Sequence, residues 1–445
     1  WLKYRLELLG RARWSLADMG HISAGRAAVL GLLPASVALL PLLVDSVVGL
    51  ATRDVVNFDF AWRFSVDYEG SSSLRDPLSA AWSTKVPHES ESDFNDSSWE
   101  VVDAPHDMLI AGQYDQHNQQ SQAFLPRGCG WYRKHFALPT DWENSTVWIY
   151  FEGIFHETTM WLNGQHLGTH EAGYTSFWYP LDRATAKYGS ANVLAVFVNA
   201  STGTGWWYEG GGLTRHQFLV RATPVFMPPD RSWVHADMSK SSIHSNGKLP
   251  ADGLSATDVR FVAEVTVRNS LDTEAHNVSV AISFRHDGGG EVAQGRSAAE
   301  SIGPRAVRTI TVEVPIQTAV QLWSVARPFL YAADVAVSVN AALVDSQQLT
   351  FGARSVRFDV DQGFLLNERR TKMRGFCDHS NFAGVGSAIP DRVNLFRAQM
   401  LRAVGANAWR MAHNPPVPVR LDIMDRLGML AMDENRDYGG HKGQG

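Results

Sequence analysis

Three apolar segments near the end of the printed sequence each finish in polar side chains of the kinds that carry out chemistry. Arginine binds a carboxylate through two parallel hydrogen bonds and keeps it ionised. Histidine donates hydrogen bonds to ligand hydroxyl groups or shares charge with a carboxylate. Together such groups are typical of the supporting part of a site whose main actors are carboxylates. In chain order the polar side chains are Asp378 and His379, then Arg410, His413 and Asn414, then Asp433 and Glu434.

Each of these residues also has an ordinary structural interpretation. A single histidine is usually a satisfied core or surface residue, and Arg410 could form a structural ion pair. Asp433 could cap a following helix, and Asp378 could bond to the backbone of its own loop. Three segment ends with the same enrichment favour a shared site, because functional groups gather at the carboxyl ends of parallel strands.

The elements that must position these groups alternate between strand and helix. Residues 390–405 are expected to form a helix, with Val393, Phe396, Met400 and Val404 on one apolar face at spacings of three and four. Strands are expected at 370–376, 406–411 and 429–433, and a second helix at 419–428. Such alternation with short links predicts parallel βαβ units. The three polar ends would then meet at one edge.

The earlier part of the chain reads as two β-sandwiches. Short strands follow one another from about residue 56 to 225, and Asn163-Gly164 is a strong signal for a hairpin. Alternating strands from about 256 to 345 are typical of an immunoglobulin-like domain. We therefore divide the sequence into residues 1–55, 56–225, 226–352 and 353–445.

The segment before the first sandwich has three interpretations. Residues 27–50 are nearly all apolar and follow Arg11, Arg13 and Arg26, as in a secretory signal peptide. A membrane anchor or an unstructured segment remains open. Four Asn-x-Ser/Thr triplets, beginning at Asn95, Asn144, Asn199 and Asn277, fit a secreted or membrane-anchored protein of the secretory pathway.

Charge and cysteine content indicate which classes of binding partner to expect for this protein. The net charge is −6 and no basic stripe is present, so a nucleic-acid partner is not expected. The two cysteines, Cys129 and Cys377, do not have metal-ligand spacing, and we expect neither a metal nor a cofactor. The sequence leaves homo-oligomerisation open.

Several separated motifs resemble glycoside hydrolase family 2, which includes β-galactosidases, β-glucuronidases and β-mannosidases. The segment NAWRMAHNPPVPVRLDIMDRLGMLAMDE is similar to a signature of that family, and RGFCDHSNFAGVGSAIP resembles the first strand of its barrel. GCGWYRKHFALP, MWLNGQHLGTHEAGYTSFWYPL and GWWYEGGGLTRHQFLV resemble its sugar-binding domain, and LWSVARPFLYAADV resembles its middle domain. The resemblance implies a jelly-roll β-sandwich, an immunoglobulin-like β-sandwich and the first strands and helices of a (β/α)8 TIM barrel.

The resemblance also implies retaining hydrolysis of β-linked carbohydrates by two glutamates, whose carboxyl groups lie about 5 to 5.5 Å apart. The family places them beyond barrel strands four and seven. The sequence contains three expected barrel strands, so we expect both glutamates to be absent and residues 1–445 to be inactive alone. Glu434 matches an Asp-Glu pair at the end of strand three and is not a substitute.

The family's functional residues carry over only where this sequence matches its motifs. His379 and His413 would contact sugar hydroxyl groups, and Arg410 would hold the nucleophile. Asp378, Asn414 and Glu434 would support substrate binding from further out. The HNPP and GWWYEGGG segments depart from the best-known members, and the second lacks the acidic, sodium-linked loop.

We therefore expect a β-galactosidase-like β-glycosidase. The alternatives are a β-glucuronidase or β-mannosidase type of substrate, or a non-catalytic carbohydrate-binding or adhesion protein.

Overall fold

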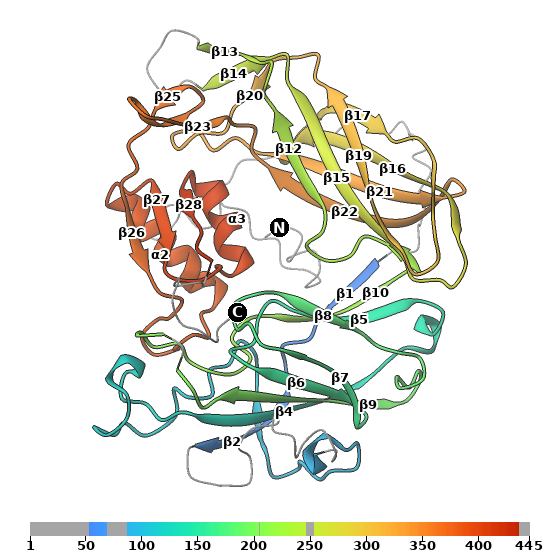
Figure 1. Ribbon diagram of the computed structural model, residues 1–445, viewed down its shortest axis with the longest axis vertical. Helices are drawn as coiled ribbons and strands as arrows, with labels where there is room; N and C mark the ends of the chain where they lie inside the picture. Colours follow the sequence, from blue (N-terminus) through green and yellow to red (C-terminus); the bar gives the residue numbers. More distant parts are fainter. Residues whose placement is uncertain (1–52, 69–86, 204, 246–252, 436–445) are drawn as a thin grey trace, which may run out of the picture.

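The computed structural model describes residues 53–68, 87–203, 205–245 and 253–435. The apolar run at 27–50, expected to be a signal or anchor, lies outside these ranges. Within them, none of the helices has the length and apolar character needed to cross a membrane. Two β-sandwiches and a smaller helix-containing unit lie around a common centre (Figure 1).

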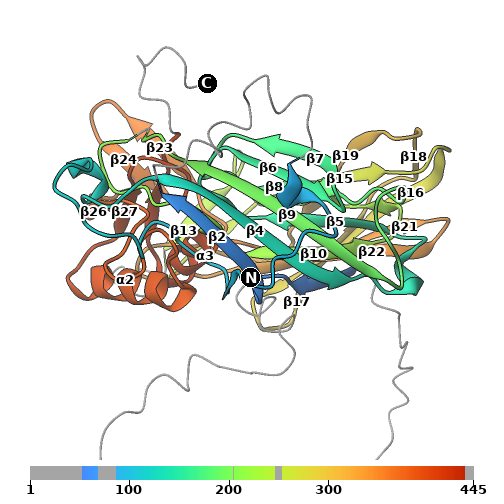
Figure 2. The same ribbon diagram turned by 90° about the horizontal axis from the view of Figure 1, so that it is seen from below.

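The first sandwich consists of two antiparallel sheets that enclose an apolar core (Figure 2). Trp62, Tyr132, Ile149 and Leu194 are almost completely buried between them. The larger sheet has the order β3 (Glu100–Val102), β2 (Trp62–Tyr68), β4 (Gly128–Ala137), β9 (Ala191–Ala200), β6 (Thr158–Leu162) and β7 (Gln165–His170). The smaller has the order β1 (Arg53–Asn57), β10 (Gln217–Ala222), β5 (Thr146–Phe151) and β8 (Phe177–Pro180). Single turns of 3-10 helix lie at His88–Ser90, Gln120–Gln122 and Thr140–Trp142.

The hairpin expected at Asn163-Gly164 is confirmed. Strands β6 and β7 pair antiparallel on either side of these two residues. Their φ angles are 51° and 83°. Positive φ at both central residues is what a two-residue hairpin turn needs to match the right-handed twist of the flanking strands.

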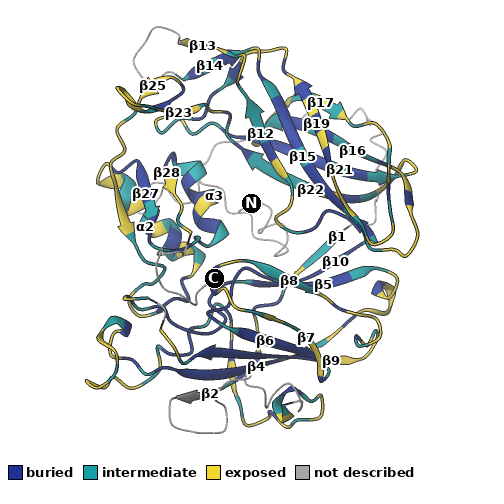
Figure 3. Ribbon diagram, viewed as in Figure 1, coloured by how far each residue is buried: buried dark blue, intermediate teal, exposed yellow. Residues whose placement is uncertain are grey.

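Several strands of the second sandwich have the alternating burial expected of an immunoglobulin-like domain (Figure 3). One sheet contains β11 (Val225–Phe226), β12 (Trp233–Asp237), β15 (Arg260–Asn269) and β19 (Val307–Pro315). The facing sheet contains β16 (Ala275–His286), β17 (Glu291–Arg296), β18 (Glu300–Ile302), β21 (Tyr331–Val339) and β22 (Ala342–Phe351). A third, small sheet joins β13 (Ser242–Ser245), β14 (Leu254–Thr257) and β20 (Val320–Gln321).

The expected parallel unit is present at the end of the described chain. Strands β26 (Gly375–Asp378), β27 (Ala408–Met411) and β28 (Leu430–Met432) pair in parallel and in this order. Helices α2 (Asp391–Ala403) and α3 (Pro418–Leu427) connect them. A small antiparallel sheet precedes the unit: β23 (Val356–Asp359), β24 (Gly363–Leu366) and β25 (Arg369–Arg370). The multidomain, mainly β architecture with a partial barrel is therefore confirmed.

Two local expectations are wrong. The strand expected at 370–376 begins only at Gly375, because the side chain of Asn407 holds the backbone before it: Nδ2 donates to the Lys372 carbonyl at 3.0 Å, and Oδ1 accepts from Arg374 N at 2.7 Å. The apolar face expected for α2 is largely exposed, with Phe396 at 52%. The helix instead buries Ala398 against the core of the parallel unit.

The parallel sheet has one face covered by helices and one open face. Trp409 and Met411 pack against α3 residues in a small apolar core. The opposite face carries Cys377 and Met432, which are exposed, on either side of Arg410. Parallel sheets are stable when both faces are covered.

We therefore expect residues after 357 of a polypeptide limited to residues 1–445 to be cut by protease before the two sandwiches. Limited proteolysis followed by mass spectrometry measures the order of cleavage. Equal resistance of this part and the sandwiches would contradict the expectation of an incompletely packed barrel.

Candidate active site

The polar groups expected at the strand ends do lie at one edge of the parallel sheet. Arg410 belongs to β27, His413 follows it, and Glu434 comes just after β28. The side chain of Arg410 lies on the open face because its neighbours Trp409 and Met411 are buried against the helices. Because side chains alternate along a strand, the guanidinium points away from the helices. We call the region around Arg410, His413 and Glu434 at this edge of the sheet the mouth.

Glu434 is the centre of a three-residue cluster at this edge. Its Oε1 forms an ion pair with Nε of Arg410, and its Oε2 lies 2.8 Å from Nδ1 of His413. Nη2 of Arg410 is also 3.3 Å from the same ring nitrogen. The side chains of Glu434 and Arg410 are 18% and 35% exposed, so the ion pair is only partly shielded from solvent. A cluster of this kind holds an imidazole in one orientation beside a charged pair.

His379 lies beside this cluster with a defined hydrogen-bonding state. Its Nδ1 is 3.0 Å from the carbonyl oxygen of Ala412. A carbonyl only accepts, so Nδ1 carries the hydrogen and Nε2 is the acceptor of the neutral ring. Burial lowers the pKa of His379 below its ordinary value and favours this neutral form. The ring centroids of His379 and His413 are 5.4 Å apart.

The first sandwich supplies the aromatic wall of the site. Trp207 stacks flat on His379, with centroids 4.7 Å apart and an interplanar angle of 3°, and lies 5.3 Å from His413. Trp206 lies nearly parallel to the ring of His413 at 6.2 Å and is 72% exposed. The mouth is thus built by two domains. The resemblance of GWWYEGGG to the family's sugar-binding domain pointed to Trp207 in a mainly structural role, and the sequence did not predict its contacts with His379 and His413.

Two of the expected site residues are not part of the cluster. Asp378 accepts a hydrogen bond from Nε1 of Trp409 at 2.8 Å and forms an ion pair with Arg397 of α2, so its carboxylate serves the helix-covered side. Asn414 is completely buried and donates to Oγ of Ser380 at 3.1 Å. Asp378 therefore joins β26 to β27 and α2, and Asn414 joins the loops after β26 and β27, so both side chains have structural partners away from the cluster.

A buried arginine of the first sandwich holds the loop that carries His413. Nη1 of Arg215 donates to the carbonyl of Tyr174 at 2.9 Å, and Nη2 donates to that of Pro415 at 2.7 Å. Weaker contacts reach the carbonyls of Glu152 and Pro416. Burial lowers the pKa of Arg215. One guanidinium therefore connects the two domains directly beneath the site.

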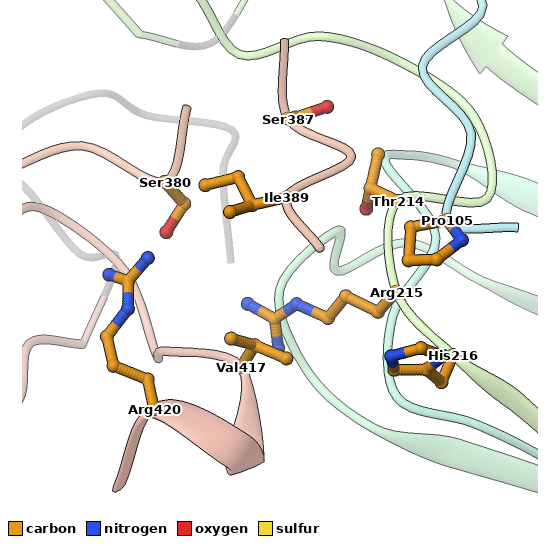
Figure 4. A pocket seen from close by; sticks show the side chains of 9 residues that line it. All are labelled: Pro105, Thr214, Arg215, His216, Ser380, Ser387, Ile389, Val417 and Arg420. Carbon is orange, nitrogen blue, oxygen red and sulfur yellow. The ribbon is translucent and has the colours of Figure 1, made fainter. Parts of the chain in front are cut away.

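Arg215 also borders a small cavity between the domains, and Figure 4 shows Arg420 reaching it from α3. Its volume of about 20 Å³ is enough for one water molecule. Burial, with Arg397 nearby, lowers the pKa of Arg420 to about 9. The guanidinium of Arg420 donates to Oδ1 of Asn394 on α2 at 3.0 Å. The cavity is too small for a sugar, so it belongs to the domain junction and not to a substrate site.

A second junction forms around Asp107. Its Oδ2 accepts from the hydroxyl group of Tyr208 at 2.9 Å and from the backbone nitrogen of Ser387 at 2.8 Å. Gly210 and Gly386 both have positive φ and pack so closely against Asp107 that a Cβ at either position would collide with its carboxylate. This contact fixes the loop after β26 against the tryptophan-bearing loop.

The described residues contain no group of three histidine, cysteine or acidic side chains that could hold a metal ion.

Comparison with known proteins assigns the chain to a family. The glycosyl hydrolases family 2 sugar binding domain matches residues 55–212, glycosyl hydrolases family 2 matches 251–354, and the TIM barrel domain of the same family matches 358–443. The chain belongs to glycoside hydrolase family 2 and corresponds to the amino-terminal portion of its members.

Relatives and solved structures agree with this assignment. A β-galactosidase of Bacteroides ovatus, BoGH2A, is 32% identical over 87% of this chain, and a β-glucuronidase of Formosa agariphila is 26% identical over 76%. A β-glycosidase structure from Bacteroides vulgatus is 27% identical, covers 86% of this chain and 44% of its own, and has a TM-score of 0.69. A family 2 β-glucuronidase structure, 22% identical, shares the fold with a TM-score of 0.73 over 90% of this chain and 41% of its own. The chain spans 42% of the length of the first relative and 35% of the second.

We expect Arg215→Met to lower the free energy of unfolding by about 3 kcal/mol or more, because it leaves several buried carbonyl oxygens without a donor. Urea denaturation followed by tryptophan fluorescence measures the change. The control is Arg221→Met on β10, the strand that begins two residues after Arg215; its partly exposed side chain pairs with Asp54 and should contribute less than about 1 kcal/mol. Equal effects of the two substitutions would contradict the bridging role of Arg215.

Proposed function

We propose that this chain is the substrate-facing amino-terminal part of a retaining β-glycosidase with β-galactosidase-like specificity. The observation that carries the proposal is the cluster of Arg410, His413 and Glu434 beside His379 and Trp207. These side chains come from two domains and three strand ends, and they converge on one mouth. Sugar recognition needs hydrogen-bonding groups and an accessible flat apolar ring. Trp206, which is 72% exposed, offers such a ring, whereas the buried Trp207 supports His379.

The described residues have separate roles in this proposal. The neutral ring of His379 accepts a hydrogen bond from a sugar hydroxyl group through Nε2. His413, held by Glu434, presents its other ring nitrogen to the substrate. Arg410 orients the carboxylate nucleophile and keeps it ionised. The family's two catalytic glutamates, expected beyond the fourth and seventh barrel strands, would attack the anomeric carbon and protonate the leaving oxygen.

The charge at the mouth favours a neutral sugar. Arg410 is engaged by Glu434 and, in this proposal, by the carboxylate nucleophile, so it is not available to pair with a carboxylate of the sugar. A glucuronide carries a carboxylate that would need a further cation at this place. A β-galactoside has no such requirement, and the relative BoGH2A is named a β-galactosidase.

A substrate panel tests the proposal. A longer gene product that contains these residues is assayed with nitrophenyl β-galactoside, β-glucuronide and β-mannoside, with residues 1–445 alone as the inactive comparison. We expect the galactoside to be hydrolysed fastest. Preference for another sugar would overturn the specificity, and no hydrolysis of any β-glycoside would favour the carbohydrate-binding or adhesion alternative.

We expect Arg410→Met in the longer product to lower kcat/KM about 100-fold, because a charge that stabilises the reacting carboxylate is lost. Steady-state kinetics on the best substrate measures the effect. The matched control is Arg357→Met, since Arg357 pairs with Asp359 and Glu368 on the surface of the β23–β24 sheet. A loss of less than threefold for Arg410→Met would count against this role.

Secretion remains part of the proposal. The basic and apolar pattern up to residue 50 supports it, and a reporter protein fused after that residue would be exported. Retention of the reporter inside the cell would remove this part without affecting the proposed reaction.

A further inference from the structure

A second concave region lies between the immunoglobulin-like sandwich and α3, where Figure 1 shows this helix beside β12 and β22. Its volume is about 490 Å³, within the usual range of small-molecule sites. Its lining includes Trp233, His235, Gln348, Arg354, Asp422 and Asp425. We refer to it as the Trp233 cleft.

The Trp233 cleft is separate from the mouth described above. In a βαβ unit the helix runs antiparallel to the strands. Asp422 and Asp425 lie in the middle and the last turn of α3, so they lie towards the amino edge of the sheet. Arg410 and His413 lie at the carboxyl edge. A ligand in the Trp233 cleft would therefore not contact the proposed catalytic groups.

An exposed indole forms one wall of the cleft. Residues alternate along β12, with Val234 buried in the sandwich core and Trp233 and His235 on the outer face. The rings of Trp233 and His235 stack with centroids 4.0 Å apart and an interplanar angle of 18°. Trp233 is nevertheless 59% exposed. The histidine thus holds a flat apolar ring in place while much of its surface remains open to solvent.

Polar groups surround this ring. Nδ1 of His235 is buried and has no hydrogen-bond partner among the described residues. Asp422 and Asp425 face the cleft from α3. Gln348 faces it from β22, and Arg354 faces it from the segment after β22. Burial raises the pKa of Asp425. An apolar plane bordered by donors and acceptors complements a pyranose, which has apolar C–H faces and hydroxyl groups around its edge.

We propose that the Trp233 cleft is a second, non-catalytic carbohydrate site, in which a sugar unit of a β-linked glycan stacks on Trp233 and its hydroxyl groups bond to His235, Asp422 and Arg354. The choice of a β-linked glycan rests on the proposed function, whereas the stacking geometry does not. Such a site would keep the enzyme on a polymer while the mouth acts on chain ends.

Native gel electrophoresis in soluble β-1,4-galactan or β-mannan tests this proposal. The longer gene product is used with Arg410→Met, so that hydrolysis of the probe is slowed about 100-fold during the run. We expect at least one polysaccharide to retard it, and Trp233→Ala to raise the dissociation constant about tenfold, as the loss of an aromatic contact implies. Trp233→Phe, which keeps an aromatic ring, should retain most of the binding. Because Trp233 is largely exposed, the melting temperatures of both variants should match that of the parent.

Trp206→Ala is the matched control, because Trp206 is the exposed tryptophan at the mouth. Retardation that depends on Trp206 and not on Trp233 would overturn the second site while supporting the proposed function. Absence of retardation in both polysaccharides would also overturn the second site. Binding that depends on Trp233, in a protein that hydrolyses no β-glycoside, would support the second site and count against the proposed function.

Discussion

The buried guanidinium of Arg215 is the interaction on which the rest of the site depends. A charged group loses its hydration when it is buried, and this cost is offset only if its donors find acceptors. Arg215 finds them in carbonyl oxygens of both the first sandwich and the segment after β27. Pro415 and Pro416 have no backbone N–H, so their carbonyls are the hydrogen-bonding groups that this part of the backbone offers. The loop that carries His413 is therefore held by a neighbouring domain.

This dependence explains why the two sides of the mouth are positioned together. The segment that begins with Trp206 and Trp207 continues directly into β10, and Arg215 lies in this segment, between Trp207 and the first residue of β10. Asp107 ties the same segment to the loop after β26 through Tyr208 and Ser387. A displacement of the sandwich would move the aromatic wall and the supports of His379 and His413 at once.

The sequence predicted those parts of the fold that local patterns determine. Asn163-Gly164 specifies its hairpin through backbone conformation alone, and the alternation of strands and helices after residue 370 predicts the parallel unit. The meeting of Arg410, His413 and Glu434 followed from the same rule about strand ends. Other features depend on tertiary contacts. Asp378 turns to the helices because Trp409 and Arg397 lie there. Helix α2 packs Ala398 against the core, with Leu395 and Leu401 partly buried beside it, so Phe396, Met400 and Val404 are left exposed. The contribution of Trp207 depends on how two domains pack, which spacing along the chain does not encode.

The close contact of Gly210 and Gly386 with Asp107 limits how such proteins can be recombined. A side chain at either glycine would push the carboxylate out of its hydrogen bonds and separate the modules. Transfer of one domain into a distant homologue would therefore succeed only if the facing domain of that homologue also had a glycine opposite the acidic residue. In this architecture we therefore expect the two domains to be exchanged between proteins as a pair and not one at a time.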